Sequence, residues 1–348
     1  MPVFRRPPRR LSRSVAPALL RLAALGLVAA ASAVHGQSLR LGVLPVEGPL
    51  ETRNDWVPLV TDLSRALGQP ARLLAPTSYD AMASALRRGD IDLAVLSGQL
   101  AIDAVTRYGM TVIARGLPAD SDRHRTVLIA RRGAAPATLD QMLALSAKWR
   151  LARGEVRSFS GYLVPQLQLF LPRGLRMEAF FATEVQGSHQ TNALAVANGE
   201  ADVGLTTGSD LARFKERFPM EYGRLAVLWR SDPLPAPLVV ARRALPESVR
   251  ARLAAHLVSL EQTRPGQEQL ARHDLAGFEP AGDAALLDNA SLVYRFDRQS
   301  ALQGSWTDEA ARQTRLTRIE HEYASLRATL DRPSRRKAQT MSAADTSH

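Results

Sequence analysis

Two serines, Ser158 and Ser160, stand just before a segment, 161–171, that the sequence predicts to be helical. Pro165 fits such a helix only near its first turn, because proline has no backbone N–H to donate in a helix interior. The N-terminus of a helix presents unpaired N–H groups and a partial positive charge of about half a unit. Serine hydroxyls beside it would form a binding site for a tetrahedral oxyanion. From spacing alone, a simple helix cap is the more common role for either serine.

A sequence that occurs twice supplies further polar groups. Residues 78–98, SYDAMASALRRGDIDLAVLSG, align without a gap with residues 188–208, SHQTNALAVANGEADVGLTTG. The first serine, several alanines, two glycines and an aspartate coincide, and apolar positions match apolar ones. An alanine-rich chain can produce such matches by chance, so two interpretations stay open: coincidence, or two lobes built to a similar plan.

The repeat places polar residues at equivalent points of two predicted sheets. In open α/β sheets, ligands bind beyond the carboxyl ends of the strands, where helix N-termini also point. We therefore expect side chains at the helix starts and strand ends to converge with Ser158 and Ser160. They are Tyr79 and Ser97 in the first half, and His189, Thr206 and Thr207 in the second. A lone histidine such as His189 is more often a surface or capping residue than a ligand contact.

The elements that carry these residues alternate between strand and helix, which is typical of parallel sheets covered by helices on both faces. In the first half we expect strands at 38–45, 71–75 and 91–96 and helices at 56–67 and 78–88. In the second half we expect strands at 125–132, 177–182 and 203–207 and helices at 161–171, 188–198 and 209–217.

The segment 225–243 is strand-like at both ends and has three prolines between, so we interpret it as a connection that returns to the first lobe. The expected limits are 37–120 for the first part of lobe 1, 121–232 for lobe 2 and 233–300 for the return, with helix predicted over 247–275. In a final segment, 301–330, apolar residues at helical spacing predict a long amphipathic helix over 306–330. This helix could pack on the body or contact a partner. The polar tail, 331–348, is expected to be disordered.

The N-terminal segment sets the expected compartment. Residues 1–36 contain six arginines and no acid, followed by the apolar run LAALGLVAAASA. This order predicts a secretory signal peptide, cleaved near residue 33 or 36, and hence a periplasmic protein. Six of the eleven net positive charges belong to that segment, so the remaining charge is too mild to indicate nucleic-acid binding. The chain has no cysteine, which excludes disulfides and thiolate metal sites.

Five stretches carry a family resemblance: LRLGVLP, TSYDAMASALRRGDIDLAVL, SFSGYLVP, GSHQTNALAVANGEADVG and SDPLPAPLVVARRALP. In this order they resemble the periplasmic phosphate/phosphite/phosphonate-binding proteins that serve ABC transporters, over residues 38 to about 290. The resemblance implies an α/β fold of the type II periplasmic-binding-protein class. In that fold two lobes, each a mostly parallel sheet flanked by helices, close like a clamshell over the ligand; here a C-terminal helix would be added.

The resemblance also implies roles for single residues. Tyr79 matches the family's binding tyrosine, His189 matches the histidine of its Gly-Ser-His motif, and Ser158 and Ser160 match the outer members of its Ser-Thr-Ser-Gly anion loop. Three positions depart from the pattern: Phe159 replaces the middle threonine, Ala101 stands at a usual tyrosine, and Ala236 stands at a usual aspartate, unless that residue is absent. Each departure removes a hydrogen-bonding group, and the binding free energy becomes less favourable by about 1 to 3 kcal/mol for each buried ligand atom left unpaired. A less negative pocket would suit a fully ionised or differently shaped anion.

The expected function is therefore that of an extracytoplasmic solute-binding protein, which captures a small oxyanion such as a phosphonate, phosphite or phosphate for an ABC transporter permease. No cofactor, metal or catalytic group is predicted, because the sequence has no G-x-S-x-G, H-E-x-x-H or P-loop motif. The alternative is a ligand-sensing periplasmic partner of a membrane sensor kinase, which the long helix at 306–330 suggests. A hydrolase is the third possibility.

Overall fold

The computed structural model describes residues 38–44 and 49–332. The chain divides after Ser38 into two units, and the unit that begins at Leu39 contains every element described below. The expected signal peptide, 1–36, and residues 333–348 of the expected tail lie outside the described residues. None of the described helices is long and apolar enough to cross a membrane.

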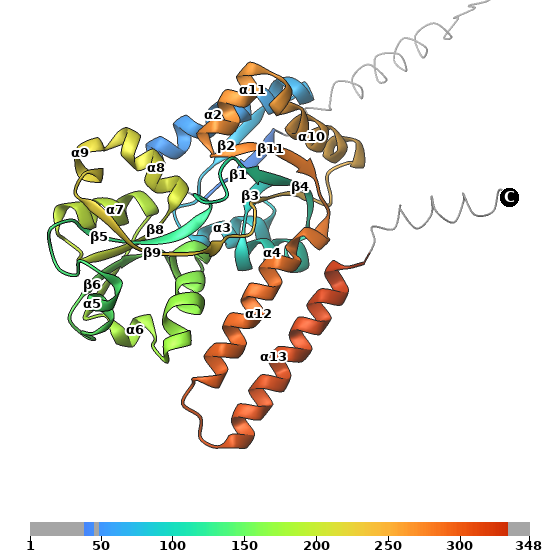
Figure 1. The fold of residues 1–348 in the computed structure, drawn as a ribbon. Helices are drawn as coiled ribbons and strands as arrows, with labels where there is room; N and C mark the ends of the chain where they lie inside the picture. Colours follow the sequence, from blue (N-terminus) through green and yellow to red (C-terminus); the bar gives the residue numbers. More distant parts are fainter. Residues whose placement is uncertain (1–37, 45–48, 333–348) are drawn as a thin grey trace, which may run out of the picture. The chain divides into compact units, whose positions relative to one another are not determined.

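Six strands form the first sheet. They are β1 (Leu39–Gly42), β2 (Ala71–Leu74), β3 (Leu93–Leu96), β4 (Met110–Pro118), β10 (Leu238–Arg242) and β11 (Leu275–Pro280). Their spatial order is β11-β4-β10-β3-β1-β2 (Figure 1). Strand β1 pairs in parallel with β2 and β3, whereas β10 pairs antiparallel with β3 and β4, and β11 antiparallel with β4.

Five strands form the second sheet. They are β5 (Arg125–Arg131), β6 (Arg150–Arg153), β7 (Thr183–Gln186), β8 (Val203–Thr207) and β9 (Leu225–Pro233). Their order is β7-β6-β8-β5-β9. Strand β6 pairs in parallel with β7 and β8, and β5 pairs antiparallel with β8 and β9.

The two-lobed α/β class predicted from the sequence is confirmed, but the sheets are mixed rather than mostly parallel. In each sheet three strands are parallel, as expected for strands joined by helical crossovers. The chain crosses between the sheets twice, from β4 to β5 and from β9 to β10. Strands β5 and β10 thus enter from the other lobe without a crossover helix, and both run antiparallel to their neighbours. The crossings at 119–124 and 234–237 lie beside the lobe limits expected at 120 and 232.

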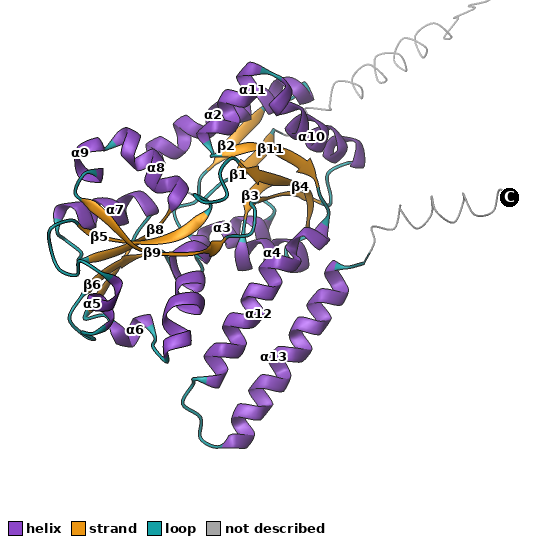
Figure 2. Ribbon diagram, in the orientation of Figure 1, coloured by secondary structure: helices purple, strands orange, loops and turns teal. Residues whose placement is uncertain are grey.

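Helices cover both faces of the first sheet (Figure 2). They are α2 (Pro49–Leu67), α3 (Tyr79–Arg88), α4 (Gly98–Arg107), α10 (Glu247–Ser259), the short 3-10 helix η4 (Leu260–Gln262) and α11 (Arg264–Arg272). Helices α3 and α4 pack with Val240 on one face, and α2, α10 and α11 pack with Val239 on the other. The opposite placement of these adjacent valines follows from the two-residue period of a strand.

Helices cover both faces of the second sheet as well. They are α5 (Leu139–Leu143), η1 (Phe159–Leu163), η2 (Gln166–Phe170), η3 (Leu171–Arg173), α6 (Met177–Phe180), α7 (His189–Asn198), α8 (Gly208–Arg217) and α9 (Pro219–Tyr222). The core on one face contains residues of α5, η1, η2 and α6, and the core on the other contains residues of α7 and α8.

Three element predictions need correction. The strand expected at 177–182 is helix α6, and the strand follows it as β7. The run MEAFFA buries apolar residues in a short segment, where periodicity cannot separate helix from strand. The helix expected at 161–171 consists of two π-helical segments, η1 and η2, on either side of Pro165, which cannot supply an internal N–H. The helical prediction for 247–275 holds for α10 and α11, but strand β11 was missed.

The C-terminal part of the described chain is a helical hairpin. After the short η5 (Asp283–Leu286) come α12 (Leu287–Leu302), which was not predicted, and α13 (Glu309–Leu330), which lies beside it (Figure 1). The rings of Tyr294 and Tyr323 stack at 4.3 Å between centroids across this hairpin, and Ile319 and Leu330 of α13 are buried. Of the apolar stripe predicted on the long helix, Ile319 and Leu330 are therefore buried, while Leu316, Tyr323 and Leu326 are partly buried.

Candidate ligand-binding site

The repeated sequence produces matching helix starts in the two lobes. The Ser78 hydroxyl accepts a hydrogen bond from Ala81 N, and the Ser188 hydroxyl accepts one from Thr191 N, both at 3.1 Å. These are ordinary N-caps, and they satisfy one backbone donor at each helix start. As a result, Tyr79 and His189 become the first residues of α3 and α7.

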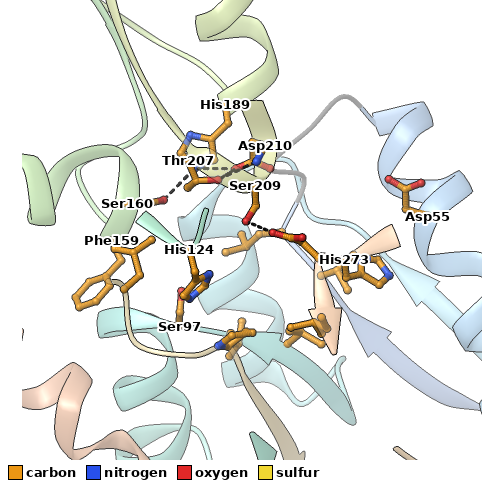
Figure 3. A pocket seen from close by; sticks show the side chains of 18 of the residues that line it. Asp55, Ser97, His124, Phe159, Ser160, His189, Thr207, Ser209, Asp210 and His273 are labelled. Atoms are coloured by element: carbon orange, nitrogen blue, oxygen red, sulfur yellow. Dashed lines mark hydrogen bonds and ion pairs between the residues drawn. The ribbon is translucent and has the colours of Figure 1, made fainter. Parts of the chain in front are cut away.

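A cavity of about 220 Å³ lies between the two sheets (Figure 3). Six of the eight residues predicted for the site line it, and they come from both lobes: Tyr79, Ser97, Phe159, Ser160, His189 and Thr207. The structure thus brings together side chains that lie up to 128 positions apart in the sequence.

Ser158 and Thr206, the other two predicted residues, are not in the cavity wall. Ser158 is 3% exposed, and its hydroxyl accepts a hydrogen bond from Gly161 N at 3.0 Å. It therefore caps η1, and it also forms a side-chain hydrogen bond with Tyr79, which does line the cavity. Thr206 is 1% exposed and pairs with Val127 of β5, so its side chain belongs to the interior of the sheet.

A hydrogen-bonded cluster forms the second-lobe side of the cavity. The Ser160 hydroxyl lies 2.9 Å from His189 Nε2, which in turn lies 3.7 Å from an Asp210 carboxylate oxygen. The Thr207 hydroxyl donates to the same oxygen at 2.6 Å, and Arg213 pairs with the other. Figure 3 shows these side chains meeting above the cavity.

Asp210 was missed in the sequence. Burial alone would raise the pKa of this carboxyl, but the charges of His189 and Arg213 and the hydrogen bond from Thr207 outweigh it and lower the pKa. Asp210 therefore remains ionised and holds the imidazole beside Ser160. The sequence Thr-Gly-Ser-Asp at 207–210 could have indicated Asp210, because a threonine followed three residues later by an acid has the spacing of a helix cap. In the structure, Asp210 N donates to the Thr207 hydroxyl at 3.0 Å.

On the first-lobe side, Tyr79 is partly buried, and burial raises the pKa of its phenol. The hydroxyl is therefore protonated near neutral pH and can donate a hydrogen bond. Its backbone N–H donates to Glu155 Oε2 at 3.2 Å across the two lobes. Ser97 precedes α4, whose first N–H, that of Gly98, already donates to Asn289 Oδ1 at 2.6 Å. One backbone donor at the start of α4 is therefore already used, as one is at the start of α7.

The three positions that depart from the family pattern have different surroundings. The Phe159 ring contacts Gly98, where an added Cβ would lie 2.7 Å from it, and the ring packs with Leu163 and Val164. Phe159 thus lines the cavity while most of its ring joins an apolar cluster. Ala101 is fully buried in the first-lobe core, and Ala236 lies in the crossing between β9 and β10.

Several wall residues were not predicted, because they come from segments that the repeat does not include. They are chiefly Asp55 and Trp56 of α2, His124 in the first crossing, Ser209 and Arg213 of α8, and His273 and Asp274 after α11. Two of their contacts join the lobes: Arg217 donates to Asp55 at 2.8 Å, and Ser209 donates to Asp274 at 2.6 Å. Within residues 38–44 and 49–332, no cluster of three His, Asp or Glu side chains could hold a metal ion.

Known proteins similar to this chain in sequence or structure include several that are named for phosphonate binding or transport. The phosphonates-binding periplasmic protein of Escherichia coli is 25% identical over 291 residues, which cover 83% of this chain and 86% of that protein. A binding protein component of an ABC phosphonate transporter from Pseudomonas aeruginosa superposes with a TM-score of 0.79 at 23% identity, covering 84% of this chain and 97% of that one. PhnD1 of Prochlorococcus marinus, solved with methylphosphonate, gives a TM-score of 0.62 at 20% identity, covering 70% and 92%.

The Pseudomonas aeruginosa and Prochlorococcus marinus structures have the same fold as this chain. The family described as "ABC transporter, phosphonate, periplasmic substrate-binding protein" matches residues 41–286, which is well over half of the chain. The chain therefore belongs to the family of periplasmic substrate-binding proteins of phosphonate ABC transporters.

Proposed function

We propose that this protein captures a phosphonate-type oxyanion in the cavity between its sheets and delivers it to the permease of an ABC transporter. The observation that carries the proposal is the convergence of Ser160, His189 and Thr207 from one lobe with Tyr79 and Ser97 from the other. Hydroxyl and imidazole donors beside the start of α7 are the groups that stabilise a tetrahedral oxyanion.

The proposal includes export and the absence of catalysis. Residues 1–36 would act as a signal peptide, so the mature protein would begin shortly after residue 33 or 36. N-terminal sequencing of protein taken from the periplasm tests this directly, and an intact Met1 would contradict it. The cavity would bind and release its ligand unchanged. Methylphosphonate incubated with the protein should therefore be recovered without release of phosphate.

The sensor-kinase alternative was suggested by the long C-terminal helix. The apolar stripe of α13 packs against α12, so it supplies no separate reason to expect a kinase partner. The transport role would be supported by loss of phosphonate uptake in cells that lack the protein, and contradicted by unchanged uptake.

Calorimetric titration with inorganic phosphate, phosphite, sulfate and methylphosphonate tests the ligand class. We expect at least one of the phosphorus oxyanions to bind, and Ser160→Ala to weaken that binding by roughly tenfold, which corresponds to about 1.4 kcal/mol for one lost hydrogen bond. Ser325→Ala, in the exposed part of α13, is the matched control and should leave affinity unchanged. Failure of all four anions to bind would reject the proposal.

A further inference from the structure

The cavity has an apolar part that a tetrahedral oxyanion does not explain. Its wall includes nine apolar residues from the first lobe and from the second crossing: Val43, Leu44, Trp56, Val95, Leu96, Leu234, Pro235, Pro237 and Leu275. A phosphonate head, with one phosphorus and three oxygens, needs only the part of the cavity next to the hydroxyl and imidazole groups. The remainder is therefore available to the substituent that the oxyanion carries.

The carboxylates in this wall already have partners. Asp55 accepts a hydrogen bond from Arg217 at 2.8 Å, and Asp274 accepts one from Ser209 at 2.6 Å and lies 3.6 Å from Arg123. The third wall carboxylate, that of Asp210, is held by Arg213 and by the Thr207 hydroxyl. An ammonium group on the ligand would have to compete with guanidinium groups for each of these carboxylates. Because desolvation of an ammonium group is costly, that competition opposes its binding.

The aromatic pair beside these residues is uncharged. The rings of Trp56 and His273 lie with their centroids 3.9 Å apart at an interplanar angle of 32°. Burial, together with the nearby charge of Arg213, lowers the pKa of His273 to about 4. The imidazole is therefore neutral at neutral pH and adds no cation to the wall, and its buried Nε2 has no hydrogen-bond partner among the described residues.

We infer that the oxyanion carries an uncharged apolar substituent, alkyl or aryl, and that Trp56 and the Leu234–Pro235 crossing select it over an ammonium-bearing one. This inference rests on the proposed function, because it concerns the other end of the same ligand. It assigns selectivity to residues that lie outside the repeat and outside the hydroxyl cluster. Apolar contact area in the wall is the physical source of the preference.

Titration of the mature protein with phenylphosphonate, methylphosphonate, 2-aminoethylphosphonate and inorganic phosphate tests the inference. We expect phenylphosphonate to bind roughly tenfold more tightly than methylphosphonate, and 2-aminoethylphosphonate roughly tenfold more weakly, since tenfold corresponds to about 1.4 kcal/mol. Equal or tighter binding of 2-aminoethylphosphonate would overturn the inference and leave the proposed function intact. If none of the four compounds binds, the proposed function fails and the inference fails with it.

Substitutions of wall residues test which of them select the substituent of the ligand. Trp56→Ala should remove most of the preference for phenylphosphonate, measured as the ratio of phenylphosphonate to methylphosphonate affinity. Because this change also removes the ring stacked on His273, Val95→Thr provides a second variant of almost the same shape, which adds a hydroxyl to the wall. It should reduce the ratio of phenylphosphonate to methylphosphonate affinity by several fold. An unchanged ratio in both variants would contradict selection by this wall.

A third variant tests the paired carboxylates. Arg217→Gln removes the guanidinium that pairs with Asp55, so the affinity ratio of 2-aminoethylphosphonate to methylphosphonate should rise by roughly tenfold. The ratio separates this effect from any general weakening of lobe closure. Arg318→Gln removes an exposed ion pair with Glu322 on α13 and should leave the ratio unchanged. A ratio that does not rise in Arg217→Gln would show that pairing of Asp55 does not exclude the ammonium group.

Discussion

The strand–helix–strand units around β1–β3 and β6–β8 are joined by the same hydrogen bonds in both lobes. In the first lobe the Arg40 guanidinium donates to the Asp92 carboxylate at 2.8 Å, and to the Gly89 carbonyl at the same distance. In the second, Arg150 donates to Asp202 at 2.8 Å and to the Gly199 carbonyl at 2.9 Å. Arg40, Gly89 and Asp92 are each separated from their second-lobe counterparts by the same number of residues that separates the two copies of the repeated sequence.

The residues that face the cavity differ between the same two units. The first-lobe helix begins with Tyr79, and the second-lobe helix begins with His189, which contacts Ser160. The repeat therefore encodes the scaffold of both lobes, whereas the chemistry on each side of the cavity depends on single positions within the repeat. Changes at equivalent residues of the two lobes can therefore separate scaffold effects from ligand effects.

The largest expected difference concerns the two aspartates. Asp92 pairs with Arg40 and also with Arg242, and its side chain is 11% exposed, compared with 24% for Asp202. Removal of a buried partner leaves charges uncompensated, so Asp92→Ala should lower the free energy of unfolding by about 3 kcal/mol. Asp202→Ala should lower it by only about 1 kcal/mol, because its pair is more exposed. Urea denaturation measures both, and equal losses would contradict the assigned difference.

The second comparison concerns the helix starts. His189→Ala should weaken methylphosphonate binding by about a hundredfold, because it removes a donor held in place by Ser160 and Asp210; this corresponds to about 2.7 kcal/mol. Tyr79→Phe should cost only about tenfold, since it removes a single neutral hydroxyl. Calorimetry gives the affinities, and thermal melting checks that both variants remain folded. A larger effect at Tyr79 would place the main anion contact in the first lobe.

The third comparison should show no difference between lobes. Gly89 and Gly199 end equivalent helices with φ values of 75° and 80°, a conformation that costs about 1 kcal/mol for a residue with a side chain. An added Cβ would first meet a guanidinium nitrogen in both cases, so Gly89→Ala and Gly199→Ala should each destabilise by about 1 kcal/mol. Gly282→Ala is the control, because nothing lies within 4 Å of its added Cβ. Unequal losses would mean that the helix ends are not equivalent.

The smallest effect is a pH dependence at Asp202. Burial tends to raise the pKa of this carboxyl, but its hydrogen bonds to the Arg150 side chain and backbone and the charge of Arg150 lower it overall. A carboxyl with a lowered folded-state pKa contributes stability above its ordinary pKa of about 3.9, and loses it as the pH falls through the folded value. The contribution should be below about 1 kcal/mol, because the site is partly exposed.

Unfolding free energies measured from pH 6 to pH 3 test this pH dependence. Asp202→Asn should be less stable than the unaltered protein at pH 6, and the gap should close toward pH 3. A constant gap across this range would contradict the assigned role of the charge.

The sequence was sufficient for features with a local physical cause. Ser78 and Ser188 could be placed at helix starts because side-chain capping involves only neighbouring residues. The return of 225–243 to the first lobe followed from its prolines, which exclude one continuous strand. Strand β11 and helix α12 were missed because the sequence was not divided into elements between 275 and 306. The short run at 177–182 was assigned to the wrong element because periodicity cannot separate helix from strand in so short a segment.

The sequence by itself predicted the two-lobed plan and four residues of the cavity wall, Tyr79, Ser97, His189 and Thr207, from the strand ends and helix starts of the repeated unit. Ser160 was predicted from the helix start beside it, and Phe159 from the family resemblance. Only the tertiary structure decided which residues complete the wall. Asp55 and Trp56 of α2 and His273, which follows α11, lie far apart in the chain, and they meet Arg213 and Arg217 of α8 only because the two sheets face each other. Contacts between distant segments depend on how whole elements pack, and neither capping nor periodicity encodes that packing.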